Sequence, residues 1–311
     1  MKKFSNKVLI ITLVVLIGIF ALSKIFRSPK LESNVRKELV RIDTAKITEV
    51  RLQPAKSLGQ EIKLIKSGKE WRVLSDSKEA KVENGTVKST LEVMMNLQAQ
   101  RMVTRKKEKW DVFEVGENST GVSVYADGKK QADFRVGKTG FSQGQGQGIS
   151  GAYTYVRLTD EEEVYSAEGF IGSHFNRSFN DWRNKTFLRV NKDDVARIEF
   201  TYPDSSFVLE KRDSLWFIDN QPANVAQVDK YFNAIRFKNV NEFEDDYVSS
   251  GEPLFKLNIV KTDETLATAQ AWPKTEDDWV LTSSFQEGVY FTSKTSGALK
   301  DVFIGENQLK D

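Results

Sequence analysis

The longest hydrophobic run in the chain is uncharged from Val8 to Ser23 and continues through Ile25 and Phe26 after a single lysine. At about 1.5 Å per residue, a helix over this run matches the hydrocarbon thickness of a bilayer, about 30 Å. We therefore predict a transmembrane signal anchor over residues 1–26.

A cleaved signal peptide is the alternative interpretation, because lysines precede the run and Ala21-Leu22-Ser23 offers a small-residue cleavage site. The run exceeds the roughly 7–15 apolar residues of a signal peptide, which favours retention. Basic residues flank it equally, at Lys2, Lys3 and Lys7 and at Lys24, Arg27 and Lys30, so charge does not fix the orientation. Because only a short tail precedes the span, we expect a single-pass inner-membrane protein with its N-terminus inside and its body facing the periplasm or cell exterior.

Residues 27–43 read as a juxtamembrane tether, after which short alternating runs predict a first α+β module over residues 44–172. In its first strand Val50 and Leu52 share a face, while Ile47 is out of step. Helical spacing of Val87, Leu91, Met94, Met95 and Gln98 predicts a helix over residues 84–99. Strands are expected at Ile47–Leu52, Glu61–Ile65, Glu70–Leu74, Gly121–Ala126, Gln131–Gly137, Tyr153–Leu158 and Glu163–Ser166, with a tight turn at Asp127-Gly128.

The same order recurs after a junction at residues 173–190, which predicts a second, similar module over residues 191–307. Trp216 corresponds to the hairpin tryptophan Trp71, and Val289-Tyr290 corresponds to Val164-Tyr165. A helix carries Val228, Phe232 and Ile235 in the places of Val87, Leu91 and Met94. The predicted strands are Val195–Phe200, Phe207–Glu210, Ser214–Ile218, Leu254–Lys261, Trp279–Thr282 and Gly288–Thr292. The fold class is thus α+β, with two tandem modules, each a mainly antiparallel sheet and one packed helix.

The amino-acid composition excludes several kinds of partner and site. The 46 basic and 44 acidic residues leave a net charge of +2, which gives no general attraction to nucleic acid. The absence of cysteine excludes disulfides, thiolate metal sites and cysteine nucleophiles. We expect no cofactor and no nucleic-acid partner.

Motifs that suggest catalysis fail on their context. Gly146-Gln147-Gly148-Ile149-Ser150-Gly151 fits a dinucleotide fingerprint formally, but a strand pattern follows it where a helix is required. A mobile connection between strands explains this Gln-Gly loop better. His174, the only histidine, lies near Ser173 and Asp181, but no serine has a nucleophile-elbow sequence. The acidic clusters at residues 160–163, 244–246 and 276–278 lack calcium-loop spacing and are interpreted as solvated turns.

Two groups of residues are possible interfaces. A basic stretch of Arg101, Arg105, Lys106, Lys107 and Lys109 after the first helix is either a solvated face or a contact with anionic lipid headgroups. The junction carries the second group, Phe179, Trp182, Arg183 and Lys185, which we expect to pack the two modules together, with Arg183 bonded to backbone or a carboxylate. A ligand site at the junction is the sharper alternative.

A family resemblance rests on the N-terminal anchor, Tyr155-Val156-Arg157, Val164-Tyr165, Trp182-Arg183-Asn184-Lys185 and the repeated tryptophan hairpin. The chain resembles an uncharacterised bacterial family of membrane-anchored proteins that are often encoded beside gliding-type ABC exporters and their auxiliary subunits. The resemblance implies an envelope complex built around an ABC transporter, with this chain as a non-ATPase component. It carries no catalytic signature.

Two functional hypotheses follow. The first is a non-catalytic, membrane-anchored accessory or scaffold subunit outside the cytoplasm, which holds partners through sheet edges and its inter-module groove. The second is an envelope enzyme that acts on glycan through paired carboxylates. An enzyme of that kind requires two acids in one concave pocket, at least one of them with a raised pKa.

Overall fold

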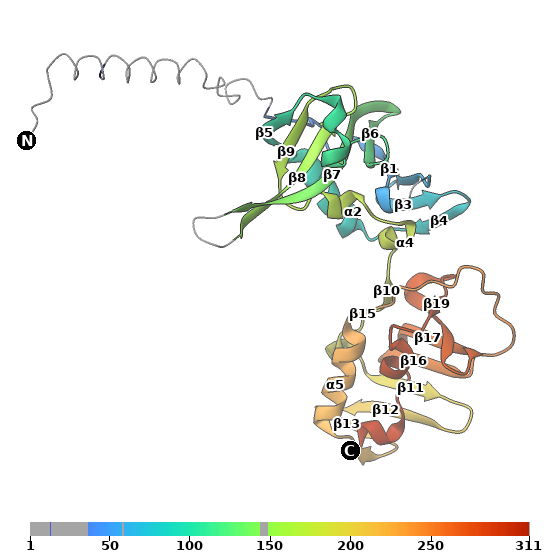
Figure 1. The fold of residues 1–311 in the computed structure, drawn as a ribbon. Coiled ribbons are helices and arrows are strands. Elements are labelled where there is room, and N and C mark those ends of the chain that lie inside the picture. Colours follow the sequence, from blue (N-terminus) through green and yellow to red (C-terminus); the bar gives the residue numbers. More distant parts are fainter. Residues whose placement is uncertain (1–12, 14–36, 58, 144–148, 311) are drawn as a thin grey trace, which may run out of the picture. The chain divides into compact units, whose positions relative to one another are not determined.

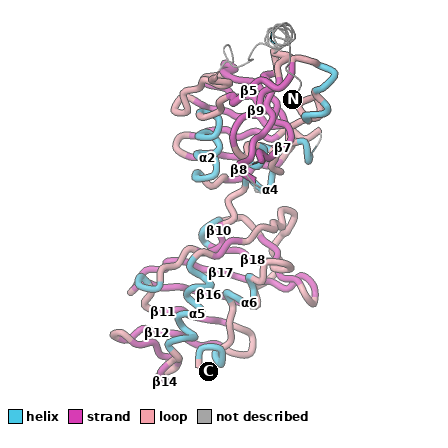
Figure 2. Tube along the Cα trace, turned by 60° about the vertical axis from the view of Figure 1, so that its left-hand side comes forward, coloured by secondary structure: helices cyan, strands magenta, loops and turns pink. Residues whose placement is uncertain are grey.

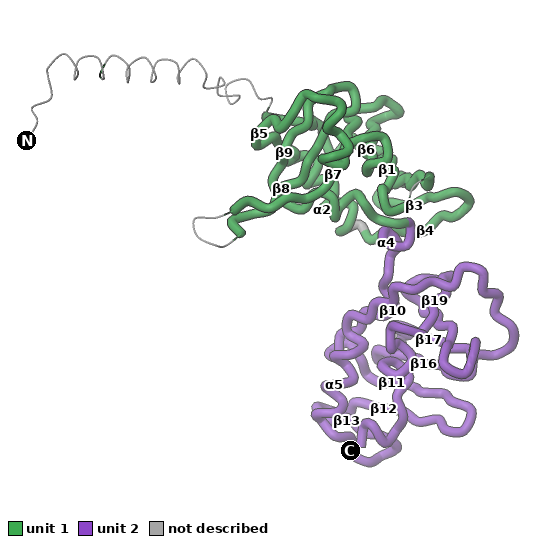
Figure 3. Tube along the Cα trace, in the orientation of Figure 1, with its two compact units in different colours: residues 1–178 green, residues 179–311 purple. Residues whose placement is uncertain are grey.

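The computed structural model describes residue 13 and residues 37–57, 59–143 and 149–310. The chain forms two compact units that divide between Ser178 and Phe179 (Figure 3). The predicted membrane anchor lies outside the described residues except for residue 13. Within the described ranges, no helix has the length and apolar content to cross a membrane. Both units are mostly antiparallel sheet with few helices, which confirms a sheet-rich α+β fold.

The first unit is a nine-stranded sheet in the order β4-β3-β2-β1-β6-β7-β8-β9-β5 (Figure 1). Its elements are β1 Ile47–Gln53, β2 Ile62–Ser67, β3 Glu70–Ser75, β4 Lys78–Lys81, α2 Asn84–Met95, β5 Ala99–Thr104, β6 Thr120–Ala126, β7 Lys129–Gln143, β8 Ile149–Leu158, β9 Val164–Glu168 and α3 Gly172–Phe175. Short 3-10 turns lie at Ala55–Ser57 (η2), Lys107–Lys109 (η3) and Asp111–Phe113 (η4). The predicted Asp127-Gly128 turn joins β6 to β7, with φ of 49° and 75°.

Alternation along β1 places Val50 and Leu52 in the core, as predicted. Ile47, which was expected to be out of step, is also fully buried. A register shift between Ile47 and Glu49 in the pairing with β6 accounts for this, because an extra residue in one strand moves the next side chain to the other face.

The first unit begins earlier than expected. Residues 37–43, which were predicted to be tether, are part of the fold: Glu38 bridges Gln98, and the amide of Leu39 donates to the carbonyl of Leu97 at 3.0 Å. Leu39 and Val40 are both buried. Burial of these two apolar side chains explains why this segment packs against the chain that follows α2.

The second unit has an eight-stranded sheet in the order β14-β13-β12-β11-β16-β17-β18-β19, with β10 and β15 as a separate pair. Its elements are α4 Phe179–Trp182, β10 Thr186–Leu188, η5 Lys192–Asp194, β11 Arg197–Thr201, β12 Ser206–Arg212, β13 Leu215–Ile218, β14 Gln221–Pro222, α5 Val225–Arg236, β15 Lys238–Asn239, β16 Phe255–Lys261, β17 Glu264–Thr275, β18 Asp278–Ser283, η6 Ser284–Gln286, β19 Phe291–Thr292, α6 Ala298–Val302 and η7 Glu306–Leu309. Helix α5 packs on the sheet (Figure 2), and its Val228, Phe232 and Ile235 are buried in the core as predicted.

The strand orders of the two sheets correspond from β4/β14 to β9/β19, and β5 is an additional edge strand in the first sheet. The registers agree in detail: Trp71 lies opposite Lys66, and Trp216 lies opposite Lys211. The predicted equivalence of Tyr290 with Tyr165 is wrong by one residue. Tyr165 lies opposite Val156 as Phe291 lies opposite Leu281, so Phe291, and not Tyr290, is the counterpart of Tyr165.

An ion pair on the polar face of each sheet has its partners exchanged between the units. In β1 Arg51 donates to Glu49, and in β11 Arg197 donates to Glu199 at 2.8 Å. The pairing of Val50 with Leu64 and of Ile198 with Leu209 places these residues at matching positions. The hydrogen bond to Glu199 is the largest cause that raises the pKa of Arg197. A charged, half-exposed face opposite an apolar face is typical of an antiparallel sheet covered on one side.

Candidate interaction site

The hairpin of β7 and β8 extends beyond the other strands of its sheet (Figure 1). Strand β6 pairs with β7 only as far as Val136, whereas β7 and β8 pair onward from Thr139 to Gln143. Within the described residues, the outer edge of β7 over residues 138–143 therefore has no neighbouring strand. Unpaired N–H and C=O groups at such an edge can accept another extended chain.

The same hairpin exposes large apolar side chains. Phe141 is 54% exposed and Ile149 is 73% exposed. Phe170, which is 58% exposed, lies edge-on to Phe141 with 6.0 Å between ring centroids. Apart from Lys138, the described residues of the extension carry no charge. Charged side chains are one device that protects natural edges against pairing, so an edge with a single charge and an exposed phenylalanine is a candidate contact surface.

Gly140 leaves room for an aromatic ring on the extension. A Cβ at this position would lie 2.5 Å from the ring of Tyr153 on the opposite strand. The Tyr153 ring therefore covers the glycine directly, and it packs edge-on against Tyr155 with 5.4 Å between centroids. The ring stabilises β7 where its outer edge has no neighbouring strand, while Tyr153 itself pairs with Glu168 of β9 on the other side. The predicted Gln-Gly loop is shorter than expected, because β7 continues to Gln143 and β8 begins at Ile149. Its centre, residues 144–148, lies outside the described residues.

The basic segment, defined as residues 101–109, begins on edge strand β5 and continues into η3. Arg105 pairs with Glu163 at 3.3 Å, and the ammonium of Lys107 lies 5.3 Å from the centre of the Trp110 ring. Lys106, Lys107 and Lys109 are exposed. Arg105 is thus tied to an acid of the first unit, whereas the lysines face solvent.

Trp110 and Arg157 fix the chain that follows the basic segment. The Arg157 guanidinium lies 3.7 Å from the centre of the Trp110 ring, and its Nε donates to the carbonyl of Val115 at 3.0 Å. Its Nη1 donates to three further carbonyls, those of Leu158, Thr159 and Glu161. Burial is the main cause that lowers the pKa of Arg157. Sequence analysis singled out Arg157 only as part of a family motif, because an alternating strand gives no sign that its arginine will be buried.

Arg183 is the centre of the predicted junction cluster. It is buried, its Nη1 lies 2.7 Å from Asp245, and its guanidinium is 3.5 Å from the centre of the Phe243 ring and 5.5 Å from that of Phe179. The expected bond from Arg183 to a carboxylate is therefore present. Trp182 is buried, and the carbonyl of Lys185 accepts from Val240 at 2.9 Å. These contacts all lie inside the second unit. The predicted role of the cluster in packing the modules together stays a prediction.

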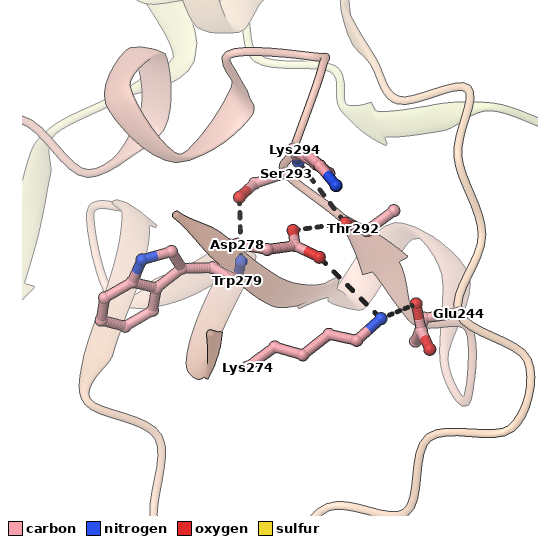
Figure 4. A network of polar contacts seen from close by, with 7 residues as sticks. All are labelled: Glu244, Lys274, Asp278, Trp279, Thr292, Ser293 and Lys294. Carbon is pink, nitrogen blue, oxygen red and sulfur yellow. Dashed lines mark hydrogen bonds and ion pairs between the residues drawn. The ribbon is translucent and has the colours of Figure 1, made fainter. Parts of the chain in front are cut away.

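A polar network fixes the β17–β18 hairpin of the second unit (Figure 4). The Lys274 ammonium lies 2.6 Å from Glu244 and 3.8 Å from Asp278, and the Thr292 hydroxyl donates to Asp278. The hydrogen bond to Glu244 is the largest cause that raises the pKa of Lys274. Asp278 was expected in a solvated turn but is buried, because the strand that starts with it pairs with β17. Lys274 bridges the two acids, so the arrangement stabilises the hairpin and the loop that carries Glu244.

A polar cleft of about 320 Å³ in the first unit brings two carboxylates together. Asp111 and Glu114 line it with Gly116, Asn118 and other residues of the loop before β6. Glu114 has a left-handed backbone, with φ of 56°. Two acids that line one concavity meet one part of the requirement of the glycan-acting alternative, which also depends on a carboxyl separation of about 5–10 Å.

His174 and Ser173 do not form the serine–histidine hydrogen bond of a catalytic triad. The Ser173 hydroxyl donates to the carbonyl of Phe170 at 2.7 Å and not to the imidazole. The buried Nδ1 of His174 has no hydrogen-bond partner within the described residues, and burial lowers the pKa of the imidazole. Among the described residues, no group of three or more histidine or acidic side chains could hold a metal ion.

The two units define a sheet-rich α+β protein with two sheets of corresponding strand order. The chain belongs to the family described as a domain of unknown function, DUF4340, whose family model matches residues 71–277. The match starts at Trp71 in β3 and ends before β18, so it takes in parts of both units. No curated protein and no solved structure shows significant similarity to the chain.

Proposed function

We propose that this protein is a non-catalytic, membrane-anchored accessory subunit that holds a partner protein outside the cytoplasm. The observation that carries the proposal is the extended β7–β8 hairpin, with its unpaired edge and the exposed side chains of Phe141 and Ile149. A partner strand would pair with the edge, and the apolar side chains of that strand would cover Phe141 and Ile149. The N-terminal apolar run supports the anchor.

The proposed partner is a subunit of an ABC-transporter-linked envelope complex. This part of the proposal comes from the resemblance of the Tyr155-Val156-Arg157 and Trp182-Arg183-Asn184-Lys185 motifs to proteins encoded beside such transporters. The corresponding strand orders further suggest that a tandem duplication produced the two units, after which the first gained the longer hairpin.

Affinity purification of the solubilised full-length chain tests the proposal. We expect transporter subunits to be recovered with the natural chain and to be lost with Phe141→Ser/Ile149→Ser. Each buried apolar anchor contributes about 1–2 kcal/mol to a typical interface, so recovery should fall at least about tenfold. The matched control is Val225→Ser/Phe237→Ser, which removes comparably exposed side chains, 60% and 62%, from the second unit. Equal recovery with both double variants would contradict the hairpin as the contact.

The alternative function is a glycan hydrolase built on Asp111 and Glu114 in the polar cleft. Its test is release of reducing ends from peptidoglycan fragments by the purified full-length chain. The accessory function predicts no release. Release that disappears in both Asp111→Asn and Glu114→Gln would establish the enzyme instead.

A further inference from the structure

The basic segment lies on the side of the first unit from which the N-terminal part of the chain arrives. The amide of Ala99, the first residue of β5, donates to the carbonyl of Lys37 at 2.8 Å, and the bridge between Glu38 and Gln98 is antiparallel. Partners in an antiparallel pair run in opposite directions. Strand β5 therefore runs from Ala99 to Thr104 in the direction opposite to that of the chain at Lys37 and Glu38, and its far end lies toward the side from which the described chain begins.

The chain outside the described fold is too short to hold this edge far from a bilayer. Ten residues, 27–36, separate Phe26 at the end of the apolar run from Lys37. Fully extended, ten residues span at most about 35 Å. The β5 edge is thus confined near the membrane if the anchor is retained, while β4 forms the opposite edge of the sheet.

The charges of the segment suit an anionic surface. No acid pairs with Lys106, Lys107 or Lys109 in the described part of the chain. Glu108 and Asp111 lie between or beside them in the sequence. The acidic turn of residues 160–163 also lies close by, because Glu163 pairs with Arg105 and the Glu162 carbonyl accepts from the Trp110 indole. The three lysines therefore supply the attraction against these acids. The contact between Arg157 and Trp110 fixes the chain directly behind them, which limits the conformational entropy lost on binding.

We propose that the basic segment docks on anionic phospholipid headgroups of the bilayer that holds the anchor. The inference rests on the retained anchor of the proposed function. Lys106, Lys107 and Lys109 would contact phosphates, while Arg105 stays paired with Glu163 on the surface of the unit. Docking would hold the first unit at the membrane and restrict the positions that its β7–β8 hairpin can reach.

The test uses the full-length chain in lipid nanodiscs, one set of phosphatidylcholine and one containing phosphatidylglycerol. The chain has no cysteine, so Val112→Cys gives a single site for a fluorophore at an exposed position beside the segment. Headgroup-labelled quencher lipid reports its approach to the bilayer. We expect strong quenching only in the anionic discs, reversed at about 1 M salt, where the screening length is about 3 Å.

The charge variant is Lys106→Gln/Lys107→Gln/Lys109→Gln. Each lysine near an anionic surface changes the docking equilibrium about fivefold, so the triple variant should reduce it on the order of 100-fold. The control Lys69→Gln/Lys78→Gln/Lys81→Gln removes exposed lysines at and near the opposite edge strand and should leave quenching unchanged.

Three results would overturn the proposal. Equal quenching in both disc compositions would assign the approach to the anchor alone, and no quenching in either would assign the lysines to solvent or another partner. In both cases the chain still copurifies with the discs, so the proposed function stands. Failure of the chain to copurify with discs at all would remove the anchor, and with it both proposals.

Discussion

Three single residues show how the fold is specified: two are polar side chains that are buried, and one is a glycine with no room for a side chain. Arg157 lies among backbone carbonyls, and Asp278 is held by Thr292 and Lys274. A buried polar group costs free energy unless it is bonded, so each such residue specifies one arrangement of the chain around it. Gly137 also specifies one arrangement of the chain, because the loop before β6 packs so closely on its Cα that no side chain fits there.

A methyl group at Gly137 tests that packing. A Cβ would lie 2.2 Å from the carbonyl oxygen of Phe113, which is backbone and has little room to move. We expect Gly137→Ala to lower the free energy of unfolding by about 1–3 kcal/mol, as overpacked sites do. Urea unfolding of the solubilised chain measures this. The control is Gly151→Ala, where no atom lies within 4 Å of the added Cβ; equal stability of the two variants would show that the loop does not pack as described.

The only histidine gives a second residue-scale prediction. Burial, followed by the charge of Arg177, lowers the pKa of His174 below its usual value. A depressed histidine pKa means that the unfolded chain binds the proton more readily, so stability is full above the unfolded pKa, about 6.5, and falls as pH drops below it. The imidazole resonance in NMR should titrate below that value. His174→Gln should reduce the loss of stability between about pH 7 and pH 5; an identical loss in both chains would contradict the burial argument.

At the scale of elements, sequence patterns predicted strands well wherever large apolar residues alternate, as in β1, β2, β12 and β16. Strand β17 was missed because its buried positions are Ala267, Ala269 and Ala271, which give a weak hydrophobic and strand signal. Helix α2 ends at Met95 and leaves it exposed, while Leu97 beyond the end is buried, because the chain turns there to start β5. Nothing in local spacing reports such a tertiary contact.

The candidate site was predictable only in part. The bond from Arg183 to a carboxylate follows from burial of a charged residue among aromatics, and the structure supplies Asp245. The β7–β8 extension was not foreseen, because glycine and glutamine around Phe141 resemble a loop in sequence. Pairing across the hairpin and the Tyr153 ring over Gly140 stabilise strands that local propensity disfavours.

The two helices provide an element-scale test of the repeat. In the second unit Phe232 packs on Trp216 with 5.0 Å between ring centroids. Leu91 holds the matching place in the first unit, beside Trp71 in an open cleft of about 480 Å³. We expect Leu91→Phe to fill part of this cleft and raise the free energy of unfolding by about 0.5–2 kcal/mol. Val50→Phe, in the closed core, should instead cost about 1–3 kcal/mol. Thermal or urea unfolding compares them, and destabilisation by Leu91→Phe would contradict the equivalence of the helices.

For the whole molecule, the proposed function requires the body to lie outside the cytoplasm. The cysteine-free sequence allows a single reporter, and Ser249→Cys places one on an exposed loop. A maleimide that does not cross membranes should label it in intact spheroplasts as completely as in lysed ones. Val280→Cys, at a fully buried position, is the unlabelled control. Labelling of Ser249→Cys only after lysis would place the body in the cytoplasm and reject the proposed topology.

In the proposed function the extended hairpin holds an ABC-transporter subunit, and photo-crosslinking in living cells tests this contact most directly. A photoreactive phenylalanine analogue at Phe141, compared with the same analogue at the similarly exposed Phe237, reports what touches each position. The proposed function predicts a discrete product from Phe141, identified by mass spectrometry as a transporter subunit, and none from Phe237. Crosslinks of Phe141 to no protein, or equal products from both positions, would contradict it.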